Sequence, residues 1–506
     1  MEISAAQLIG FRTVPGNGPT FHAFNPASDQ PLTPSFQEAT REQIHETVVL
    51  AQKAFTQYRK TTSLQRSLFL EAIATNIEAM GDELLQIIHL ETALPLSRLG
   101  GERVRTTSQL KLFAQLLRDG HWNKNIVDKA LPERKPTPRP EIVQRQIPIG
   151  VVAIFGASNF PLAFSVGGGD TASALAAGCP VVFKAHPAHP ASCQLVGTAI
   201  VKAARETNMP DGVFSLLHGF SHEMGEALVT HPLVKAVAFT GSFRGGKALY
   251  DLGVRRKEPI PVYAEMGSVN PIFFLPGAIK KGGENLAVQF AQSVTLGSGQ
   301  FCTNPGICIL LNSEESRAFL QKTADGLAGS NVHPLLTKEI AMAYAKGLDN
   351  QSKLPGVKVL TQGRKKNIDP SIQFVEAKRV LQQPDYFEEI FGPSTLAILA
   401  EGIEELYQII DIMPGQLTGT IHADETDHSE VIGLIDHLTQ KVGRLLMNGF
   451  PTGVEVSSAM VHGGPYPATT DSRVTSVGTT AIYRFTRPIC YQNIPSSLGE
   501  ITIKND

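Results

Sequence analysis

Cysteine is scarce in this sequence, and three other features are absent. Five cysteines among 506 residues, an odd number with no CxxC pair, argue against a disulfide framework and against a structural metal site. No apolar run approaches the ~20 residues that span a bilayer, and the N-terminus lacks the basic and apolar regions of a signal peptide. The formal net charge of -2 offers no basic surface for nucleic acid or an anionic membrane. We therefore expect a cytoplasmic protein without a resident metal.

The composition is typical of a globular protein. Hydrophobic residues make up 42% of the chain and charged residues 18%, unlike a disordered protein. A chain of 506 residues exceeds what one hydrophobic core usually serves, so we expect two or three domains.

The first part of the chain predicts helices. Apolar residues recur at helical spacing through residues 36–118, in a segment from about residue 38, a second over 64–90 and a third over 97–118. Thr40 precedes Gln43 by three residues, the spacing of a capping box, so the first helix should begin there. Four prolines within residues 131–140 predict an extended connector that cannot join a helix.

After this connector, short β-branched runs alternate with segments rich in alanine and glycine. This alternation predicts βαβ units and a parallel sheet covered by helices on both faces. The expected strands are residues 151–155, 181–183, 213–217 and 236–239, and the expected helices are residues 171–177, 191–207, 222–230 and 246–252. A second α/β segment follows over about residues 265–475, with a strand at 306–311.

The C-terminal tail predicts one more strand, over residues 479–487. It has no obvious partner inside either α/β segment. Together with residues 142–148, it is expected to form a projecting pair of strands that finds partners in another subunit.

Two segments at strand ends carry groups suited to binding. Asn159 follows the strand at 151–155, where the chain is expected to enter a helix, and its amide could donate to a developing oxyanion. A simple turn residue before Phe160-Pro161 is the alternative. Ser242 follows another strand end and opens a helix, whose free amides and dipole favour a phosphate. An ordinary helix cap is the alternative there.

Two further segments carry reactive groups. Glu265 lies just before a glycine turn, where burial would raise its pKa to suit a general base, although most glutamates are solvated. Cys302 lies in a glycine-rich loop that lets the backbone approach a ligand, and its thiol can react once deprotonated. A small buried hydrophobe in a tight turn is the alternative. The other cysteines are expected to be core or spectator residues: Cys179, Cys193, Cys308 and Cys490.

Six motifs, in order and over nearly the whole chain, resemble the aldehyde dehydrogenase superfamily. They are Asn159-Phe-Pro, Lys184, Phe239-Thr-Gly-Ser, Glu265-Met-Gly, Gly299-Gln-Phe-Cys and Glu388-Glu-Ile-Phe-Gly-Pro. The resemblance implies that the Cys302 thiolate attacks an aldehyde carbon, with Asn159 and the Cys302 backbone N–H holding the oxyanion. After hydride transfer to a nicotinamide dinucleotide, Glu265 would activate water and release a carboxylic acid.

The same resemblance implies a cofactor site. Lys184 would bind the adenosine ribose, Gly219 would line the adenine pocket and Ser242 would bind the pyrophosphate. Glu389 would bind the nicotinamide ribose, with Phe391 packing nearby.

The fold that the resemblance implies is α/β. A Rossmann-type cofactor domain would comprise residues 1–119 and 147–263, and an α/β catalytic domain residues 264–475. A small β oligomerisation element would comprise residues 120–146 and 476–506. The assembly would be a homodimer or a homotetramer that acts on a small aldehyde.

Two departures from the family pattern concern the site. Ser158 stands where many members have tryptophan. Pro187 stands three residues after Lys184, where NAD-preferring members carry a glutamate that would chelate the ribose 2′-hydroxyl and repel a 2′-phosphate. The cofactor is therefore NADP or NAD, with NADP favoured.

Three segments indicate which subgroups of the superfamily the chain resembles. They are residues 165–174, 447–456 and 460–473. They resemble 2,5-dioxopentanoate (α-ketoglutarate semialdehyde) dehydrogenases and NADP-dependent fatty aldehyde dehydrogenases. His462, within the last of them, could assist proton transfer near the thiol or simply pack in a glycine-rich turn. The first substrate class needs a cationic group at the far end of its tunnel, for which Arg473 is one candidate, although it could equally form a structural salt bridge. The second class needs an apolar tunnel.

Three other functions fit the motifs less well. An aldehyde dehydrogenase that acylates coenzyme A would share the thiol, but such relatives generally lack the water-activating glutamate, here Glu265. A cysteine hydrolase would not need the ribose and phosphate segments. A structural protein on this fold would not need Cys302, Glu265 and Asn159 together.

Overall fold

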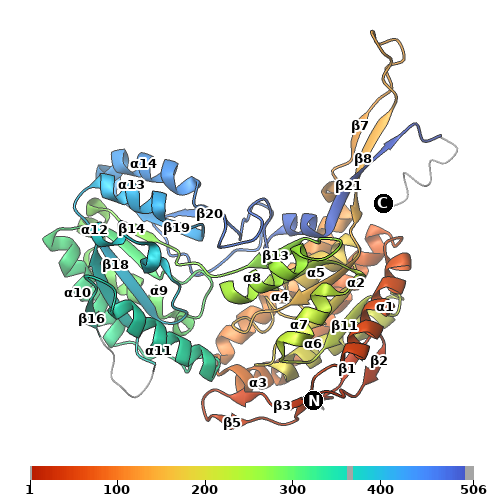
Figure 1. Cartoon of the computed structure of the whole chain (residues 1–506), viewed down its shortest axis with the longest axis horizontal. Coiled ribbons are helices and arrows are strands. Elements are labelled where there is room, and N and C mark those ends of the chain that lie inside the picture. Colours follow the sequence, from red (N-terminus) through yellow and green to blue (C-terminus); the bar gives the residue numbers. More distant parts are fainter. Residues whose placement is uncertain (1–2, 362–367, 496–506) are drawn as a thin grey trace.

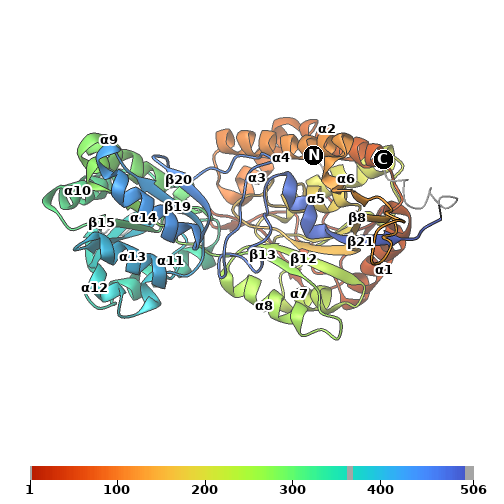
Figure 2. The same ribbon diagram turned by 90° about the horizontal axis from the view of Figure 1, so that it is seen from above.

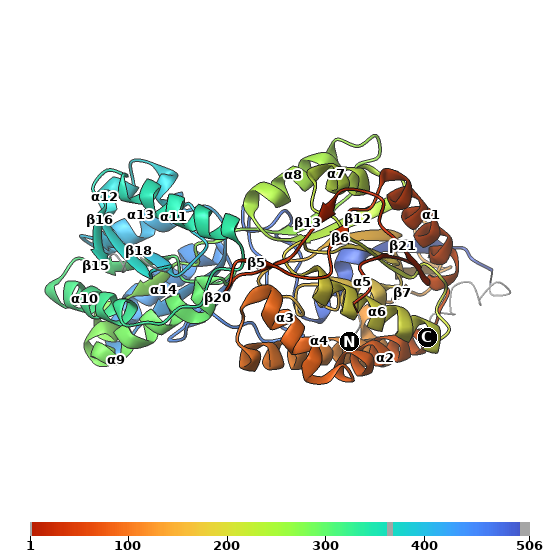
Figure 3. The ribbon, with the colours of Figure 1, turned by 90° about the horizontal axis from the view of Figure 1, so that it is seen from below.

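The computed structural model describes residues 3–361 and 368–495 and shows two α/β bodies with an arm that projects from one of them (Figures 1, 2 and 3). Within those residues, no helix combines the length and the hydrophobicity needed to cross a membrane.

The first body is built on a seven-stranded sheet. Its strands lie in the order β13 (Val262–Glu265), β12 (Val234–Thr240), β9 (Val151–Phe155), β10 (Val181–Lys184), β11 (Phe214–Leu217), β1 (Gln7–Ile9) and β2 (Arg12–Val14). The strands from β13 to β11 are parallel, and β1 is antiparallel to both β11 and β2. This confirms the parallel sheet that the alternating pattern predicts.

Helices cover both faces of this sheet because alternate side chains of each strand point to opposite faces. Val152 and Ile154 of β9 face one buried core, whereas Val151 and Ala153 face the other. The first core includes α2 (Ser63–Glu78), α4 (Leu96–Asp119), α5 (Gly169–Ala177) and α6 (Pro190–Glu206). The second includes α1 (Arg41–Tyr58), α7 (His222–Thr230) and α8 (Phe243–Val254). Figure 2 shows α2 and α4 on the side opposite α7 and α8.

For the N-terminal helices, the predicted start of the first helix is confirmed, whereas the single helix expected over residues 64–90 is not. Thr40 caps α1: its hydroxyl accepts from the Gln43 backbone N–H, and the Gln43 side chain accepts from the Thr40 N–H, as the capping box predicts. Residues 64–90 do not form one helix. The chain breaks between α2 and α3 (Gly81–Thr92) because Gly81 adopts a left-handed φ of +59°.

The second body contains another seven-stranded sheet. Its order is β16 (Lys358–Thr361), β17 (Ser371–Glu376), β18 (Ser394–Ala400), β15 (Ile307–Leu311), β14 (Ile272–Phe274), β19 (Gln416–His422) and β20 (Val442–Met447). Only β16 is antiparallel to its neighbour. Its helices are α9 (Pro276–Thr295), α10 (Glu314–Ala328), α11 (Lys338–Ser352), α12 (Ala377–Val380), α13 (Ile403–Ile412) and α14 (His428–Thr439).

The projecting arm is a three-stranded antiparallel sheet of β21 (Thr486–Gln492), β8 (Ile142–Pro148) and β7 (Ile126–Asp128) (Figure 1). This confirms the predicted pairing of residues 142–148 with the tail. The predicted start of the tail strand is wrong, because residues 479–485 form a 3₁₀ helix. Ala481, Ile482 and Phe485 of that helix are fully buried in the core of the first body, so tertiary packing overrides their local β preference.

The chain returns from the second body to the first between β20 and the 3₁₀ helix (Figure 1). This returning segment lies along the edge of the first sheet: the Met266 N–H donates to the Ala468 carbonyl at 2.8 Å, and Glu265 pairs with Thr469 in an antiparallel bridge. Residues 460–476 are thereby brought to the end of β13.

Candidate active site

The loop that carries Cys302 lies between the 3₁₀ helix Leu296–Gly299 and β15, at the edge of the second body. Gly299 has a φ of +67°, and a Cβ there would lie 2.2 Å from the backbone of Gly392, so only glycine fits this close approach. The Asn270 side-chain amide, fully buried, donates to the carbonyls of Cys302 (2.8 Å) and Asn304 (2.9 Å). The loop is therefore fixed on both sides of the thiol.

The Cys302 thiol lies close to two side chains from distant parts of the sequence, His462 and Glu265. Cys302 Sγ lies 3.4 Å from His462 Nε2, and His462 Nε2 lies 2.9 Å from Glu265 Oε1. Glu265 comes from the end of β13, and His462 comes from the returning segment. Both side chains are buried, whereas Cys302 keeps partial exposure. The sequence predicted each residue separately, and the structure brings all three into contact.

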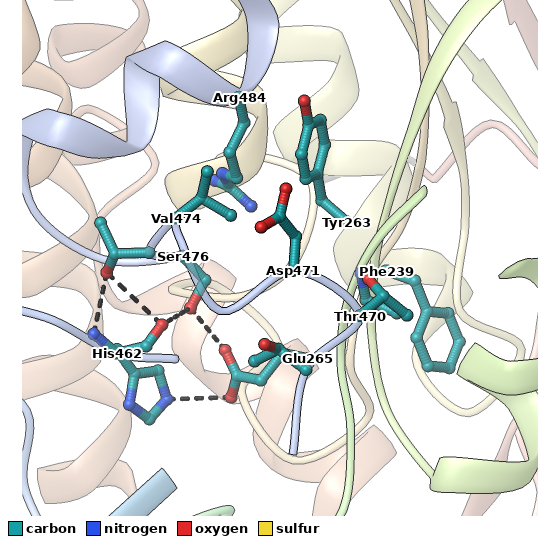
Figure 4. A pocket seen from close by; sticks show the side chains of 12 residues that line it. Phe239, Tyr263, Glu265, His462, Thr470, Asp471, Val474, Ser476 and Arg484 are labelled. Carbon is teal, nitrogen blue, oxygen red and sulfur yellow. Dashed lines mark hydrogen bonds and ion pairs between the residues drawn. The ribbon is translucent and has the colours of Figure 1, made fainter. Parts of the chain in front are cut away.

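Glu265 is an ionised carboxylate whose pKa lies below its usual value, whereas the sequence predicted a raised pKa suited to a general base. Burial does raise its pKa, but the charge of His462 and hydrogen bonds from His462, Ser476 and Cys302 outweigh it and hold the pKa below its usual value. The Ser476 hydroxyl donates to Glu265 Oε2, on the side away from His462 (Figure 4). The prediction of a raised pKa was wrong because Ser476 and His462 come from a segment remote in sequence.

The pKa of Cys302 is well above its usual value. Burial raises it first, and the negative charge of Glu265 and a hydrogen bond to Glu265 raise it further, while the charge of Arg105 lowers it. The resting residue is thus a neutral thiol beside an ionised carboxylate. A thiolate forms when the sulfur's proton passes to the Glu265 carboxylate.

A small pocket opens beside Glu265, and Figure 4 shows the side chains around it. Its walls include Tyr263, Asp471, Thr470 and Arg484, with Glu265 and Ser476 at one end. The pocket gives the carboxylate a polar surrounding on the side away from the thiol.

Asn159 approaches the same loop from the first body. Its side-chain amide donates to the Gln300 carbonyl at 2.9 Å, which leaves one amide hydrogen for another acceptor, and Arg98 donates to its backbone carbonyl at 2.6 Å. The helix predicted over residues 171–177 is confirmed as α5, which begins at Gly169, so the chain does not enter a helix directly after Asn159. The intervening residues are irregular, and the Leu162 and Ala163 amides donate to Glu102 instead of to a helical turn.

The expectation of no metal stays a prediction. Glu265, Cys302 and His462 each offer a ligand-type atom, and these atoms lie within 4.8 Å of one another. All five cysteines are free thiols.

The residues expected to bind the adenosine lie at the ends of β10 and β11. Burial lowers the pKa of Lys184 to about 8, which the charge of Glu38 partly offsets. Glu38, which no motif singled out, is tied to the turn after Gly219: its two oxygens accept from the Phe220 and Ser221 N–H groups and from the Ser221 hydroxyl. A Cβ on Gly219 would lie 2.1 Å from the sulfur of Met224 and 2.9 Å from Glu38, so a larger residue there would displace these two side chains.

Ser242 caps α8. Its hydroxyl oxygen accepts from the Gly245 N–H at 3.3 Å, and the hydroxyl hydrogen stays available to a further acceptor. Residues 241–244 are exposed, so the positive end of this helix dipole faces outward. The capping role of Ser242 is therefore observed, and its binding of a phosphate stays a prediction.

Glu389 and Phe391 line a second pocket, together with Phe301 of the Cys302 loop. Burial raises the pKa of Glu389 to about 7, offset in part by the Ser268 N–H. The negative charge of Glu389 also contributes to the raised pKa of the Cys302 thiol, which places it within electrostatic range of the sulfur.

Known proteins match this chain over most of its length. The model of the aldehyde dehydrogenase family matches residues 13–471. Alpha-ketoglutaric semialdehyde dehydrogenase 2 of Azospirillum brasilense is 46% identical over 98% of this chain and 96% of its own length. Alpha-ketoglutaric semialdehyde dehydrogenase of Acinetobacter baylyi is 44% identical over 100% of this chain and 96% of its own.

Solved structures share the fold. A betaine aldehyde dehydrogenase from Staphylococcus aureus, in complex with NAD+, superposes with a TM-score of 0.82 at 21% identity and covers 98% of both chains. Methylmalonate-semialdehyde dehydrogenase from Oceanimonas doudoroffii has the same TM-score at 20% identity, over 99% of this chain and 100% of its own.

Proposed function

Because this chain belongs to the aldehyde dehydrogenase family, and therefore oxidises aldehydes with NAD(P), we propose that its substrate is 2,5-dioxopentanoate and its product 2-oxoglutarate. The observation that carries the chemistry is the contact between Cys302, His462 and Glu265. The substrate class is supported by two relatives at 44% and 46% identity over their full lengths, both called alpha-ketoglutaric semialdehyde dehydrogenases.

The first step forms a bond between sulfur and carbon. The Cys302 proton passes to the Glu265 carboxylate, which releases it to solvent before the second step, and the thiolate attacks the aldehyde carbon. The carbonyl oxygen becomes an oxyanion, which the free amide hydrogen of Asn159 and the Cys302 N–H would stabilise. NAD(P), when bound, supplies the hydride acceptor, and loss of the aldehyde hydrogen as hydride leaves a thioester on Cys302.

The second step is hydrolysis. Glu265, ionised in the resting site, accepts a proton from water as the water oxygen attacks the thioester carbonyl. The sulfur leaves and is reprotonated, and the free carboxylic acid departs. Ser476 holds the carboxylate by one oxygen, so the other remains directed toward the thiol and His462.

The residues present fit a dinucleotide. Lys184 and the Gly219 turn suit the adenosine, Ser242 at the start of α8 suits the pyrophosphate, and Glu389 with Phe391 suits the nicotinamide ribose. The Gly219 turn would be filled by any Cβ, and the hydroxyl of Ser242 keeps a free hydrogen.

NADP is the proposed preference, with NAD as the alternative. Pro187 offers no carboxylate to chelate a ribose 2′-hydroxyl. Glu38 is within electrostatic range of Lys184, but both of its oxygens are already occupied by the turn at Ser221, so it is not free to take that role. A 2′-phosphate could then pair with the Lys184 ammonium.

An aldehyde panel tests the substrate and the cofactor together. We expect kcat/KM for 2,5-dioxopentanoate to exceed that for medium- and long-chain fatty aldehydes, and NADP to exceed NAD with the same aldehyde. A fatty aldehyde that wins by about tenfold or more, roughly 1.4 kcal/mol in transition-state binding, would establish the alternative substrate class instead.

We also propose that the projecting arm joins copies of this chain into a homodimer or homotetramer. Ile126 and Val127 of β7 are 56% and 55% exposed, and β7 and β21 are the open edges of the arm sheet. Val127→Lys should shift the sedimentation coefficient of the protein toward that of the monomer. Ile432→Lys is the control, because Ile432 is 73% exposed on α14 in the other body and should leave the assembly unchanged. A monomeric parent protein would refute the proposal.

A further inference from the structure

One face of α4 carries a row of polar side chains toward the catalytic centre. Arg98, Glu102 and Arg105 follow one another at spacings of four and three, so they lie on the same side of the helix. Arg98 donates to the Asn159 carbonyl, and Glu102 accepts from two backbone amides of the segment after Asn159. These two residues therefore position the Asn159 segment.

Arg105 does not form a comparable hydrogen bond among the described residues. Its Nε and one terminal nitrogen are buried and have no hydrogen-bond partner in the part of the chain that the structure describes. A guanidinium stays charged even when burial lowers its pKa. These two nitrogens of Arg105 are therefore charged donors without a hydrogen-bond acceptor, which is unfavourable in a buried position.

The position of Arg105 follows from a chain of contacts. Its guanidinium lies 5.3 Å from the centre of the Phe164 ring, and that ring lies 6.0 Å from the ring of His462. His462 in turn contacts Cys302 at 3.4 Å. The charge of Arg105 also lowers the pKa of the thiol, so the guanidinium is within electrostatic range of the reacting sulfur.

The other arginines around the site are held by protein acceptors, although Arg98 Nη1 and Arg444 Nε are also buried without a partner among the described residues. Arg484 pairs with Asp170 at 2.7 Å, and both terminal nitrogens of Arg444 donate to backbone carbonyls. Arg473, the candidate suggested by the sequence, has an 85% exposed side chain and pairs with Asp471 in its own turn. None of these contacts connects Arg473 with the Cys302 thiol.

We propose that Arg105 binds the carboxylate at the far end of the aldehyde substrate, through its unpartnered guanidinium donors. This inference rests on the proposed function, because only an anionic aldehyde would need such a partner. A 2-oxo acid brings an acceptor pair that suits a guanidinium, whereas a neutral aldehyde would leave these donors unmatched. Phe164 would stack on the guanidinium and hold its plane.

The test compares two aldehydes of equal length, 2,5-dioxopentanoate and pentanal, in the full-length enzyme with saturating NADP. Arg105→Met should lower the ratio of their kcat/KM values by about 30-fold or more, the scale of one lost charge-assisted hydrogen-bonded pair. The ratio is the decisive quantity. The same substitution raises the thiol pKa, but that effect acts on both aldehydes and cancels in the ratio. Arg105→Lys, which keeps the charge, should recover part of the ratio.

Arg473→Met is the matched control and should leave the ratio unchanged, since that arginine is solvent-exposed and pairs with Asp471. If Arg105→Met slows both aldehydes equally, Arg105 only balances the charge of Glu102, and the inference fails while the proposed function stands. If the parent enzyme itself prefers pentanal, both the inference and the proposed substrate fail.

Discussion

Cys302→Ala is expected to lower kcat for every aldehyde by at least about 10⁴-fold, the scale on which removal of a catalytic nucleophile acts. The reason is that no other described thiol can replace it. Cys179, Cys193 and Cys308 are fully buried, and Cys490 is in the arm. Initial-rate assays with 2,5-dioxopentanoate and NADP measure the effect.

The variant should still bind the dinucleotide, because Lys184, Ser242 and Glu389 are unchanged. Fluorescence titration with NADPH measures this, and a Kd close to that of the parent protein is expected. Cys490→Ser is the matched control: it also removes one thiol, but from the exposed strand β21, and full activity should remain. Turnover that survives in Cys302→Ala would show that the thioester mechanism is wrong.

Glu265→Gln is expected to separate the two halves of the reaction. Hydrolysis should slow by about 10²- to 10⁴-fold, the range for removing a general base, because the amide cannot accept the proton of water. Thiol attack should persist, since His462 remains in contact with Cys302. Stopped-flow absorbance should then show one equivalent of NADPH in a burst, and mass spectrometry of the quenched protein should show the acyl group on Cys302.

The same variant tests the electrostatics of the pair. The negative charge of Glu265 raises the pKa of the Cys302 thiol, so removing that charge should lower the pKa. Alkylation of Cys302 by iodoacetamide, followed peptide by peptide, should therefore become faster at neutral pH and shift its midpoint downward. Glu258→Gln, at an exposed carboxylate paired with Lys235, should leave the profile unchanged. A midpoint that moves upward in Glu265→Gln would contradict the assigned charge.

Much of the fold could be predicted because strands that are buried on both faces must be almost continuously apolar. The runs at 151–155, 181–183 and 213–217 obey this requirement, and each lies at a strand of the first sheet. The capping box at Thr40 could be predicted for a similar reason: every group it needs lies within four residues.

The errors fall where distant segments decide local structure. Residues 479–485 have the composition of a strand, but burial of Ile482 and Phe485 in the first core makes them a 3₁₀ helix. The chain does not enter a helix directly after Asn159: the Leu162 and Ala163 amides donate to Glu102 of α4, and α5 begins at Gly169, close to its predicted start at residue 171. Neither segment contains a sequence pattern that predicts its contact with a distant part of the chain.

For the site, the sequence by itself determined which reactive groups exist: a thiol at Cys302, a carboxylate at Glu265, an imidazole at His462 and an amide at Asn159. Only the tertiary structure decided their states. The carboxylate is ionised because His462 and Ser476 return along the edge of β13 and donate to it, and the thiol is neutral because burial and the charge of Glu265 raise its pKa. A pKa depends on charge and burial within a few ångströms, and those neighbours are set by the fold rather than by the order of residues along the chain.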